Sequence, residues 1–268
     1  MPRSIALLVT LSFALTASAD ERSLNGFLKI KSFSVPEAHQ AVAVDLRSFY
    51  AISNRTIARY AKETTESKPK AIVRWTAPAE SPVKHLNSGI VLNGRLYCAN
   101  STWPKKPLRN TVEVFEAATL QHLERKEFLE TEGAINWIDR HSGAWWIVFA
   151  FYGKADVRKT RLVSYNDDWQ NTGVWTFPES VIQRFLPNSN SGGAFGPQGR
   201  LFVTGHDHGE LYVLAVGQKP GELIHEATIK APIAGQGIAW DNGKPPTLYG
   251  IVRRSHEVVR MTISPTVN

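Results

Sequence analysis

Short apolar runs and polar turns alternate along the whole sequence, and the same order recurs five times. Each of the five segments begins with an apolar run containing Gly or Ala, continues through a polar turn and ends in a second run centred on an aromatic residue. The segments span residues 39–53, 87–98, 133–148, 190–203 and 235–252, and their starts lie about 45 to 57 residues apart. Self-similarity at this period indicates an architecture that repeats one supersecondary unit.

Four strands per repeat are typical of a β-propeller blade, and the strand candidates match that number. Each of the first four segments is followed by two further candidates, at residues 56–60 and 71–75, 111–115 and 124–129, 161–165 and 172–177, and 211–216 and 223–229. The fifth segment offers only three, at 237–240, 248–252 and 258–263, and the alternating residues 27–33 supply the fourth. The sequence therefore predicts an all-β fold, a five-bladed β-propeller closed by its N-terminal strand. A β-sandwich or another all-β array is the alternative.

Local signals add detail to this architecture. The turns Asn93-Gly94, Gln198-Gly199 and Asn242-Gly243 suit tight hairpins. Residues 179–186, which lie between two prolines, predict one short helix. We interpret Trp145, Trp146 and Trp240 as packing between blades.

Residues 1–19 have the features of a secretory signal peptide. Arg3 supplies the positive charge, residues 5–15 are mostly apolar, and Ala17-Ser18-Ala19 is a small-residue cleavage site. The apolar run is too short to span a bilayer, and no later stretch approaches about 18 uninterrupted apolar residues. We therefore expect residues 20–268 to form a single exported domain, secreted or periplasmic, without a membrane span.

The composition fits one large β domain stabilised by burial. Hydrophobic residues make up 43% of the chain, and the single cysteine, Cys98, cannot form an internal disulfide. Cys98 lies in an apolar run, so we interpret it as a buried strand residue and not a catalytic thiol. The formal charge is +7, but the basic residues are scattered. Because no basic groove pattern with stacking aromatics is found, nucleic acid is not an expected partner. We expect a monomer whose partner is a small polar or anionic molecule.

The propeller hypothesis sorts polar residues between the two mouths of the central channel. All first strands run the same way, so the residues before them converge with those that end the antiparallel second strands. This end, which we call the histidine mouth, receives His39, Gln40, His85, Asn87, Ser88, Asn190, Ser191 and Gln236 from the first strands, and Asn54, Arg55, Ser101, His206, Asp207, Arg253 and Arg254 from the second. The other end, the opposite mouth, receives Asp45, Asn93, Asp139, His141 and Asp241.

The histidine mouth is the candidate ligand site, because closed β folds tend to bind ligands at such mouths. The candidate catalytic residues are His39 or His206 as general base, with Asp207 orienting a histidine. The same two histidines are candidate ligands of a divalent metal ion, the only cofactor suggested here. The candidate ligand-binding residues are Gln40, His85, Asn87, Ser88, Asn190, Gln236 and Arg253, with Arg253 or Arg254 for an anionic group.

Each of these signals also has a structural interpretation. Asn-Ser-Gly stands at the first strand of segments two and four, at residues 87–89 and 190–192, where such residues often turn the chain or bond neighbouring backbone. His206-Asp207-His208 resembles a metal motif, yet alternation along a strand would separate Asp207 from the two histidines. Histidines at these positions also bond carbonyl groups of adjacent blades.

The blade pattern resembles the exported glutamine cyclotransferases, a family of five-bladed propellers of similar size. The resemblance rests on Gly94-Arg-Leu-Tyr97 and on residues 112–120, a strand followed by an acidic residue and an Ala-Thr-Leu turn. His39-Gln-Ala-Val42 is similar to the start of that family's first blade. NHL, YVTN-type and regucalcin-like propellers share the same general pattern.

The resemblance implies the fold but not the activity. The cyclotransferases place glutamates at strand starts, one of them the acid, whereas the matching positions here are Asn87, Gly133 and Asn190, with Glu132 one residue early. Regucalcin-like lactonases hold a divalent ion with Asn, Asp and Glu, and the histidine mouth has few carboxylates. The hypotheses are therefore a ligand- or metal-binding propeller, including a hydrolase or lactonase-type enzyme, a divergent cyclotransferase-like acyltransferase, and a non-catalytic interaction scaffold.

Overall fold

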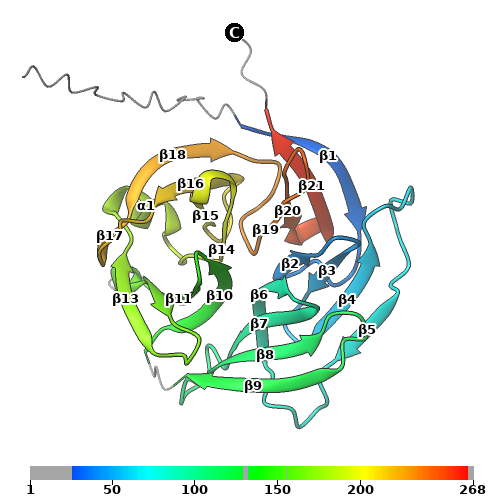
Figure 1. Ribbon diagram of the computed structural model, residues 1–268, viewed down its shortest axis with the longest axis horizontal. Coiled ribbons are helices and arrows are strands. Elements are labelled where there is room, and N and C mark those ends of the chain that lie inside the picture. Colours follow the sequence, from blue (N-terminus) through cyan, green and yellow to red (C-terminus); the bar gives the residue numbers. More distant parts are fainter. Residues whose placement is uncertain (1–25, 129–131, 155, 265–268) are drawn as a thin grey trace, which may run out of the picture.

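The computed structural model describes residues 26–128, 132–154 and 156–264, and these form an all-β, five-bladed propeller (Figure 1). Blade one contains β2 (Ala41–Val44), β3 (Ser48–Ile52), β4 (Thr56–Ala61) and β5 (Val73–Thr76). Blade two contains β6 (His85–Leu92), β7 (Arg95–Ser101), β8 (Asn110–Glu116) and β9 (His122–Phe128). The predicted propeller is confirmed, and the signal peptide predicted at residues 1–19 lies outside the described residues.

The remaining three blades follow the same order from the channel outward. Blade three contains β10 (Ala134–His141), β11 (Ala144–Ala150), β12 (Arg161–Tyr165) and β13 (Asn171–Thr176). Blade four contains β14 (Gly192–Phe195), β15 (Leu201–Thr204), β16 (Glu210–Ala215) and β18 (Ile224–Lys230). Blade five contains β19 (Ala239–Asp241), β20 (Thr247–Val252), β21 (Glu257–Ile263) and β1 (Phe27–Ser34).

The ring is closed by β1, as the sequence predicts. This strand pairs antiparallel with β21, with Phe33 opposite Val258, so the outermost strand of blade five comes from the N-terminal end (Figure 1). The pairing covers an edge that an open ring would leave exposed to other chains. Blade three differs from the prediction, because the short β17 (Gly221–Glu222) adds a fifth strand in parallel to β13.

Helical structure is confined to short connections. The predicted helix is confirmed as α1 (Glu179–Phe185), and three-residue 3₁₀ turns lie at η1 (Val157–Lys159), η2 (Pro197–Gly199) and η3 (Arg253–Ser255). No helix in the described part of the chain is long and apolar enough to cross a membrane. The hairpin between β6 and β7 has positive φ at both Asn93 and Gly94, as a type I′ turn requires.

Aromatic side chains pack the blades against one another. Trp145 lies 4.8 Å from Tyr97 of blade two, Trp146 lies 5.3 Å from Phe195 of blade four, and Trp240 packs on blade four as well (ring centroids). The three tryptophans therefore join neighbouring blades, as predicted. Cys98 is fully buried in β7, and burial raises the pKa of its thiol, which agrees with a structural role.

Small residues close the channel between its two mouths. A Cβ atom on Gly237 would lie 2.0 Å from Ser88 Oγ and 2.4 Å from Ala41 Cβ. A Cβ atom on Gly192 would lie 2.4 Å from the carbonyl oxygen of Gln236. Segments of four blades therefore touch at this waist, and the cavities at the two mouths share no lining residue.

Candidate functional site

The histidine mouth contains a cavity of about 620 Å³. Its lining residues are His39, His206, Asp207, Ala234, Gln236, Arg253, Arg254 and His256. The structure thus brings together the predicted catalytic residues with two of the predicted ligand-binding residues. They come from the starts of blades one and five and from the turns that end the second strands of blades four and five, as the sorting of strand ends predicts.

The cavity wall on the side of blades one and five is electropositive. Nε of Arg253 donates a hydrogen bond to Nε2 of His39 at 3.2 Å, and the ring of His256 stacks 6.2 Å from that of His39. Burial lowers the pKa of His39, and the charge of Arg253 lowers it further. Burial likewise lowers the pKa of His85, again with a contribution from Arg253. These two histidines therefore favour the neutral form, and His39 uses Nε2 as an acceptor.

The other wall carries a histidine-carboxylate pair. Nδ1 of His206 lies 2.7 Å from Oδ1 of Asp207, and the other oxygen of Asp207 accepts a hydrogen bond from Asn188 at 3.0 Å. Gln236 is buried and donates from Nε2 to the backbone oxygen of His206 at 3.0 Å. The contact holds the imidazole in place and leaves Nε2 of His206 for a ligand or a proton.

That His39 and His206 ligate a divalent metal ion stays a prediction. Among the described residues, no group of three His, Cys, Asp or Glu side chains is placed to hold a metal ion. Nε2 of His39 accepts the hydrogen bond from Arg253, whose charge opposes a second cation there. Since β15 ends at Thr204, His206 lies in the following turn, outside the strand alternation that the sequence argument considered.

Three predicted residues flank the cavity without lining it. Gln40 is buried and donates to Oδ1 of Asn54 at 2.5 Å. Nδ1 of His85 lies 3.4 Å from the backbone oxygen of Trp103. Asn87 has a side chain that is 6% exposed. The hydrogen bonds and burial of these residues indicate a structural role beside the mouth.

The two Asn-Ser-Gly segments have different structures. In blade two the pairing of β6 with β7 shifts register between Leu86 and Gly89, so residues 87 and 88 form a bulge at the channel waist. There the buried Ser88 Oγ has no hydrogen-bond partner among the described residues. In blade four Asn190 is fully buried and accepts a hydrogen bond from Trp137 Nε1 at 2.8 Å.

Asn190 therefore has a structural role and does not face the cavity. Its Nδ2 donates to the backbone oxygens of Gly192 and Thr204, both at 3.0 Å. With the indole bond, the carboxamide ties β14 to its own blade and to blade three. The sequence could not separate this side chain from Asn87, because the tripeptide is the same.

Replacement of these two asparagines should separate the roles. We expect Asn190→Ala to lower the free energy of unfolding by about 2–3 kcal/mol, because a buried indole donor and two backbone acceptors lose their partner. Asn87→Ala is the matched control and should cost less than about 1 kcal/mol, since the Asn87 side chain makes no hydrogen bond within the described residues. Urea unfolding followed by circular dichroism measures both; equal losses would contradict the assignment.

His256 is the lining residue that the sequence argument missed. It follows η3 in the turn from the second to the third strand of blade five, with φ of 53°. The sequence could have indicated His256, because Arg253 and Arg254 place the same turn at the histidine mouth. His256 lies two residues after Arg254, in the same turn.

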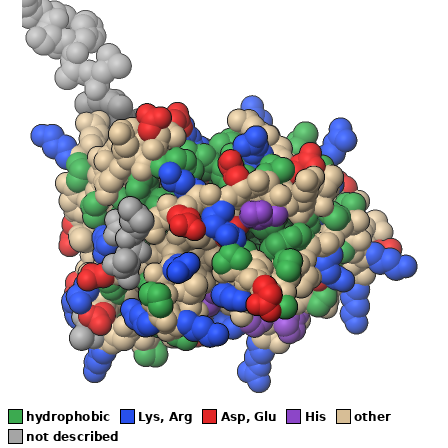
Figure 2. Space-filling view, turned by 90° about the horizontal axis from the view of Figure 1, so that it is seen from below, with side chains coloured by type: hydrophobic (Ala, Val, Ile, Leu, Met, Phe, Trp, Pro, Cys, Tyr) green, Lys and Arg blue, Asp and Glu red, His purple; other side chains and the backbone are tan. Residues whose placement is uncertain are grey.

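On the face shown in Figure 2, basic residues are mixed with acidic ones. Several form surface ion pairs, such as Arg95 with Glu124. This distribution agrees with the scattered basic positions in the sequence.

Comparison with known proteins identifies the fold. No protein-family model matches the sequence, and no curated protein is significantly similar to it. The structure of a luciferin-regenerating enzyme covers 88% of this chain and 94% of its own, with a TM-score of 0.50 and 11% identity. The PQQ-bound aldose sugar dehydrogenase from Streptomyces coelicolor covers 90% of this chain and 82% of its own, with a TM-score of 0.51 and 13% identity.

A protein of unknown function from Bacteroides caccae is also similar, at a TM-score of 0.45 and 12% identity. The match covers 72% of this chain and 60% of that protein. At such identities the similarities show the propeller fold alone. The function must be argued from the site.

Proposed function

We propose that this chain is an exported propeller that binds a small anionic molecule at the histidine mouth. The observation that carries the proposal is the pair Arg253 and Arg254, which line the cavity and form no ion pair with an acidic side chain in the described part of the chain. Export rests on the features of residues 1–19. The ligand class is a carboxylate or phosphate small enough for a cavity of about 620 Å³.

The charges at the mouth favour an anion. Its lining holds two arginines and three histidines but only one carboxylate, and Asp207 is already engaged by His206 and Asn188. Partial burial strengthens an arginine-anion hydrogen bond relative to one in open water. An anion would also favour protonation of His39, whose pKa is lowered by burial and by Arg253.

The same site offers the groups for a hydrolytic step. Nε2 of His206 would take a proton from a water molecule, while Asp207 holds the ring and stabilises its charged form. Arg253 would bind the acid group of the substrate or product. A cyclotransferase-like acyl transfer is less well served, because the described part of this mouth offers only Asp207 as a carboxylic acid and that group is paired.

Anion titrations test the binding proposal. Citrate and inorganic phosphate serve as carboxylate and phosphate probes in calorimetry, and at least one should bind, with higher affinity at about pH 5.5 than at about pH 7.5 because a bound anion favours the protonated form of His39. Arg253→Gln should weaken binding by about tenfold or more. The matched control is Arg95→Gln, which removes the same charge at the far end of a propeller strand, from a side chain that is 52% exposed.

His206→Ala separates binding from turnover. This variant should retain anion binding within about threefold and lose any hydrolase activity found in a panel of esters and lactones. Failure of both anions to bind the native protein, or equal affinities for native and Arg253→Gln protein, would contradict the proposal and leave the interaction scaffold as the better hypothesis.

A further inference from the structure

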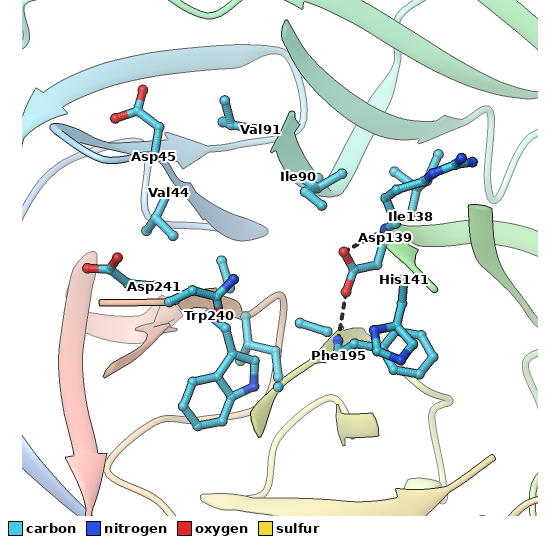
Figure 3. A pocket seen from close by; sticks show the side chains of 18 of the residues that line it. Val44, Asp45, Ile90, Val91, Ile138, Asp139, His141, Phe195, Trp240 and Asp241 are labelled. Carbon is cyan, nitrogen blue, oxygen red and sulfur yellow. Dashed lines mark hydrogen bonds between the residues drawn. The ribbon is translucent and has the colours of Figure 1, made fainter. Parts of the chain in front are cut away.

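A second cavity lies at the opposite mouth of the channel. Its volume is about 480 Å³, and it is built from the ends of the first strands of all five blades (Figure 3). The wall is about half apolar, from side chains that include Val44, Ile90, Val91, Ile138 and Ala194. Asp45 and Asp241 lie at the ends of their strands, and Asp139 lies in β10 two residues before it ends. The waist described above separates it from the histidine mouth.

Two of these three carboxylates already have strong partners. Asp45 accepts hydrogen bonds from the hydroxyl of Tyr50 at 2.5 Å and from the backbone N–H of Ser48 at 2.6 Å. Asp241 forms a buried ion pair with Lys62 at 2.6 Å. Asp241 is thus neutralised by a cation, and Asp45 is only partly buried, so that water can screen its charge.

Asp139 differs, because it is buried and has no cation beside it. Asp139 is 7% exposed. Its two oxygens accept hydrogen bonds only from backbone N–H groups, those of Arg140 at 2.7 Å and of Phe195 in blade four at 2.6 Å. The side chain of Arg140 instead pairs with Asp167 at 2.8 Å and lies over Trp145. The ring of His141 is stacked on Phe195 with centroids 4.3 Å apart (Figure 3).

The cavity wall also contains an unpartnered donor. Trp240 lines the cavity and is 7% exposed, and its indole Nε1 has no hydrogen-bond acceptor within the described residues. An uncompensated carboxylate in the wall and an unpaired indole N–H buried beneath it are costly to fold. Such features mark binding sites more often than they mark a packed core.

We propose that the opposite mouth binds a small protonated amine with an apolar body, and that Asp139 is its counter-ion. The ammonium group would lie against the carboxylate of Asp139, and the hydrocarbon part would contact Ile90, Val91 and the face of Trp240. The site is distinct from the histidine mouth and opposite to it in charge. It requires no chemistry beyond binding.

Proton linkage accompanies this site. Burial raises the pKa of Asp139 to about 7, against the opposing effect of the backbone hydrogen bonds from Phe195 and Arg140. The other charged or titratable groups of the cavity are Asp45 from blade one, Arg140 and His141 on β10, and Asp241 with Lys62. Blades two and four contribute none to the lining. A bound cation would favour the ionised carboxyl, so binding should release a proton below about pH 7.

Benzylamine and benzyl alcohol provide a matched pair of probes, since they share the ring and differ in charge. By calorimetry at about pH 7.5, benzylamine should bind the native protein at least about tenfold more tightly than benzyl alcohol. Asp139→Asn should remove that preference. Glu124→Gln is the control, because it deletes the same charge from a side chain that is 60% exposed and that pairs with Arg95, which does not line the cavity.

Two further measurements keep the proposal testable if Asp139→Asn does not fold. Ile90→Trp should fill the cavity and abolish binding of both probes while leaving citrate and phosphate affinities at the histidine mouth unchanged. In the native protein, benzylamine affinity should rise severalfold between about pH 6 and pH 8. Equal binding of amine and alcohol, unchanged amine binding in a folded Asp139→Asn protein, or a flat pH profile would each overturn the assignment.

Discussion

Trp137→Ala should lower the free energy of unfolding by about 5 kcal/mol, the largest loss expected from any substitution considered for this protein. Trp137 is fully buried and belongs to the cluster between blades three and four that also contains Val203 and Tyr212. Its ring lies against the backbone of Gly193, where a Cβ would be only 2.5 Å away. Truncation leaves a cavity that this rigid backbone cannot fill, and it removes the donor to Asn190.

Thermal and urea unfolding of Trp137→Ala measure the loss. For a domain of this size a loss of 5 kcal/mol corresponds to a fall in Tm of about 10–20 °C. Trp137→Phe is the control, because it keeps an aromatic ring in the cluster and loses the indole N–H with only part of the ring volume, so it should cost clearly less. A double-mutant cycle with Asn190→Ala should give a coupling of about 1 kcal/mol or more. A loss below about 2 kcal/mol for Trp137→Ala would contradict the packing argument.

The propeller could be predicted because its blades are encoded locally. Four short strands with a tight turn after the first recur in each blade, and the paired positive φ angles at Asn93 and Gly94 match what an Asn-Gly turn signals. Residues 27–33 could be assigned to blade five because that blade lacked one strand. The short β17 could not be predicted, since its two residues pair with β13, which lies far away in the sequence.

The histidine mouth could be predicted in part, for a geometric reason. Strand direction alone places His39, His206 and Arg253 at one end of the channel, and this required no knowledge of side-chain contacts. The contacts of each side chain could not be predicted in the same way. Asn190 turns inward to Trp137, and its equivalent Asn87 sits in a bulge; both outcomes depend on contacts that one sequence does not encode locally.

The site at the opposite mouth could not be predicted, because it depends on the lack of a cation beside a buried carboxylate. The sequence places Asp45, Asp139 and Asp241 at equivalent strand ends, so all three have the same pattern. What distinguishes Asp139 is that it is buried without a cation, whereas Asp45 is partly exposed and Lys62 reaches Asp241 from the turn after β4. Only the packed blades show which carboxylate remains without a counter-charge.

Asp139→Asn should raise the free energy of unfolding above that of the native protein at alkaline pH. The difference between variant and native protein should be up to about 4 kcal/mol larger there than in acid. An aspartate in an unfolded chain has a pKa of about 3.9, and burial raises the pKa of Asp139 to about 7 in the folded protein. The folded state therefore binds this proton more tightly than the unfolded state. Stability should fall as the pH rises between these two values and stay low above them.

Urea unfolding of native and Asp139→Asn protein at about pH 4, 6 and 8 measures this difference. Near pH 4 the carboxyl is protonated in the folded state and about half protonated in the unfolded state, so the variant should show little beyond the constant effect of the amide on the bonds from Arg140 and Phe195. By pH 8 the native protein must hold an ionised carboxylate without a counter-ion, and the gap should widen by several kcal/mol. Glu124→Gln, at an exposed position away from the cavity, should show no such widening.

The amine site makes a further demand on the same experiment. If Asp139 is the counter-ion of a bound ammonium group, saturating benzylamine should restore the stability that the native protein loses at pH 8, because the ligand binds the folded state and compensates the buried charge. It should do nothing for Asp139→Asn. A gap between the two proteins that does not change with pH would show that Asp139 is not a buried uncompensated carboxyl. A gap that widens but does not respond to benzylamine would leave the burial argument intact and remove the amine from it.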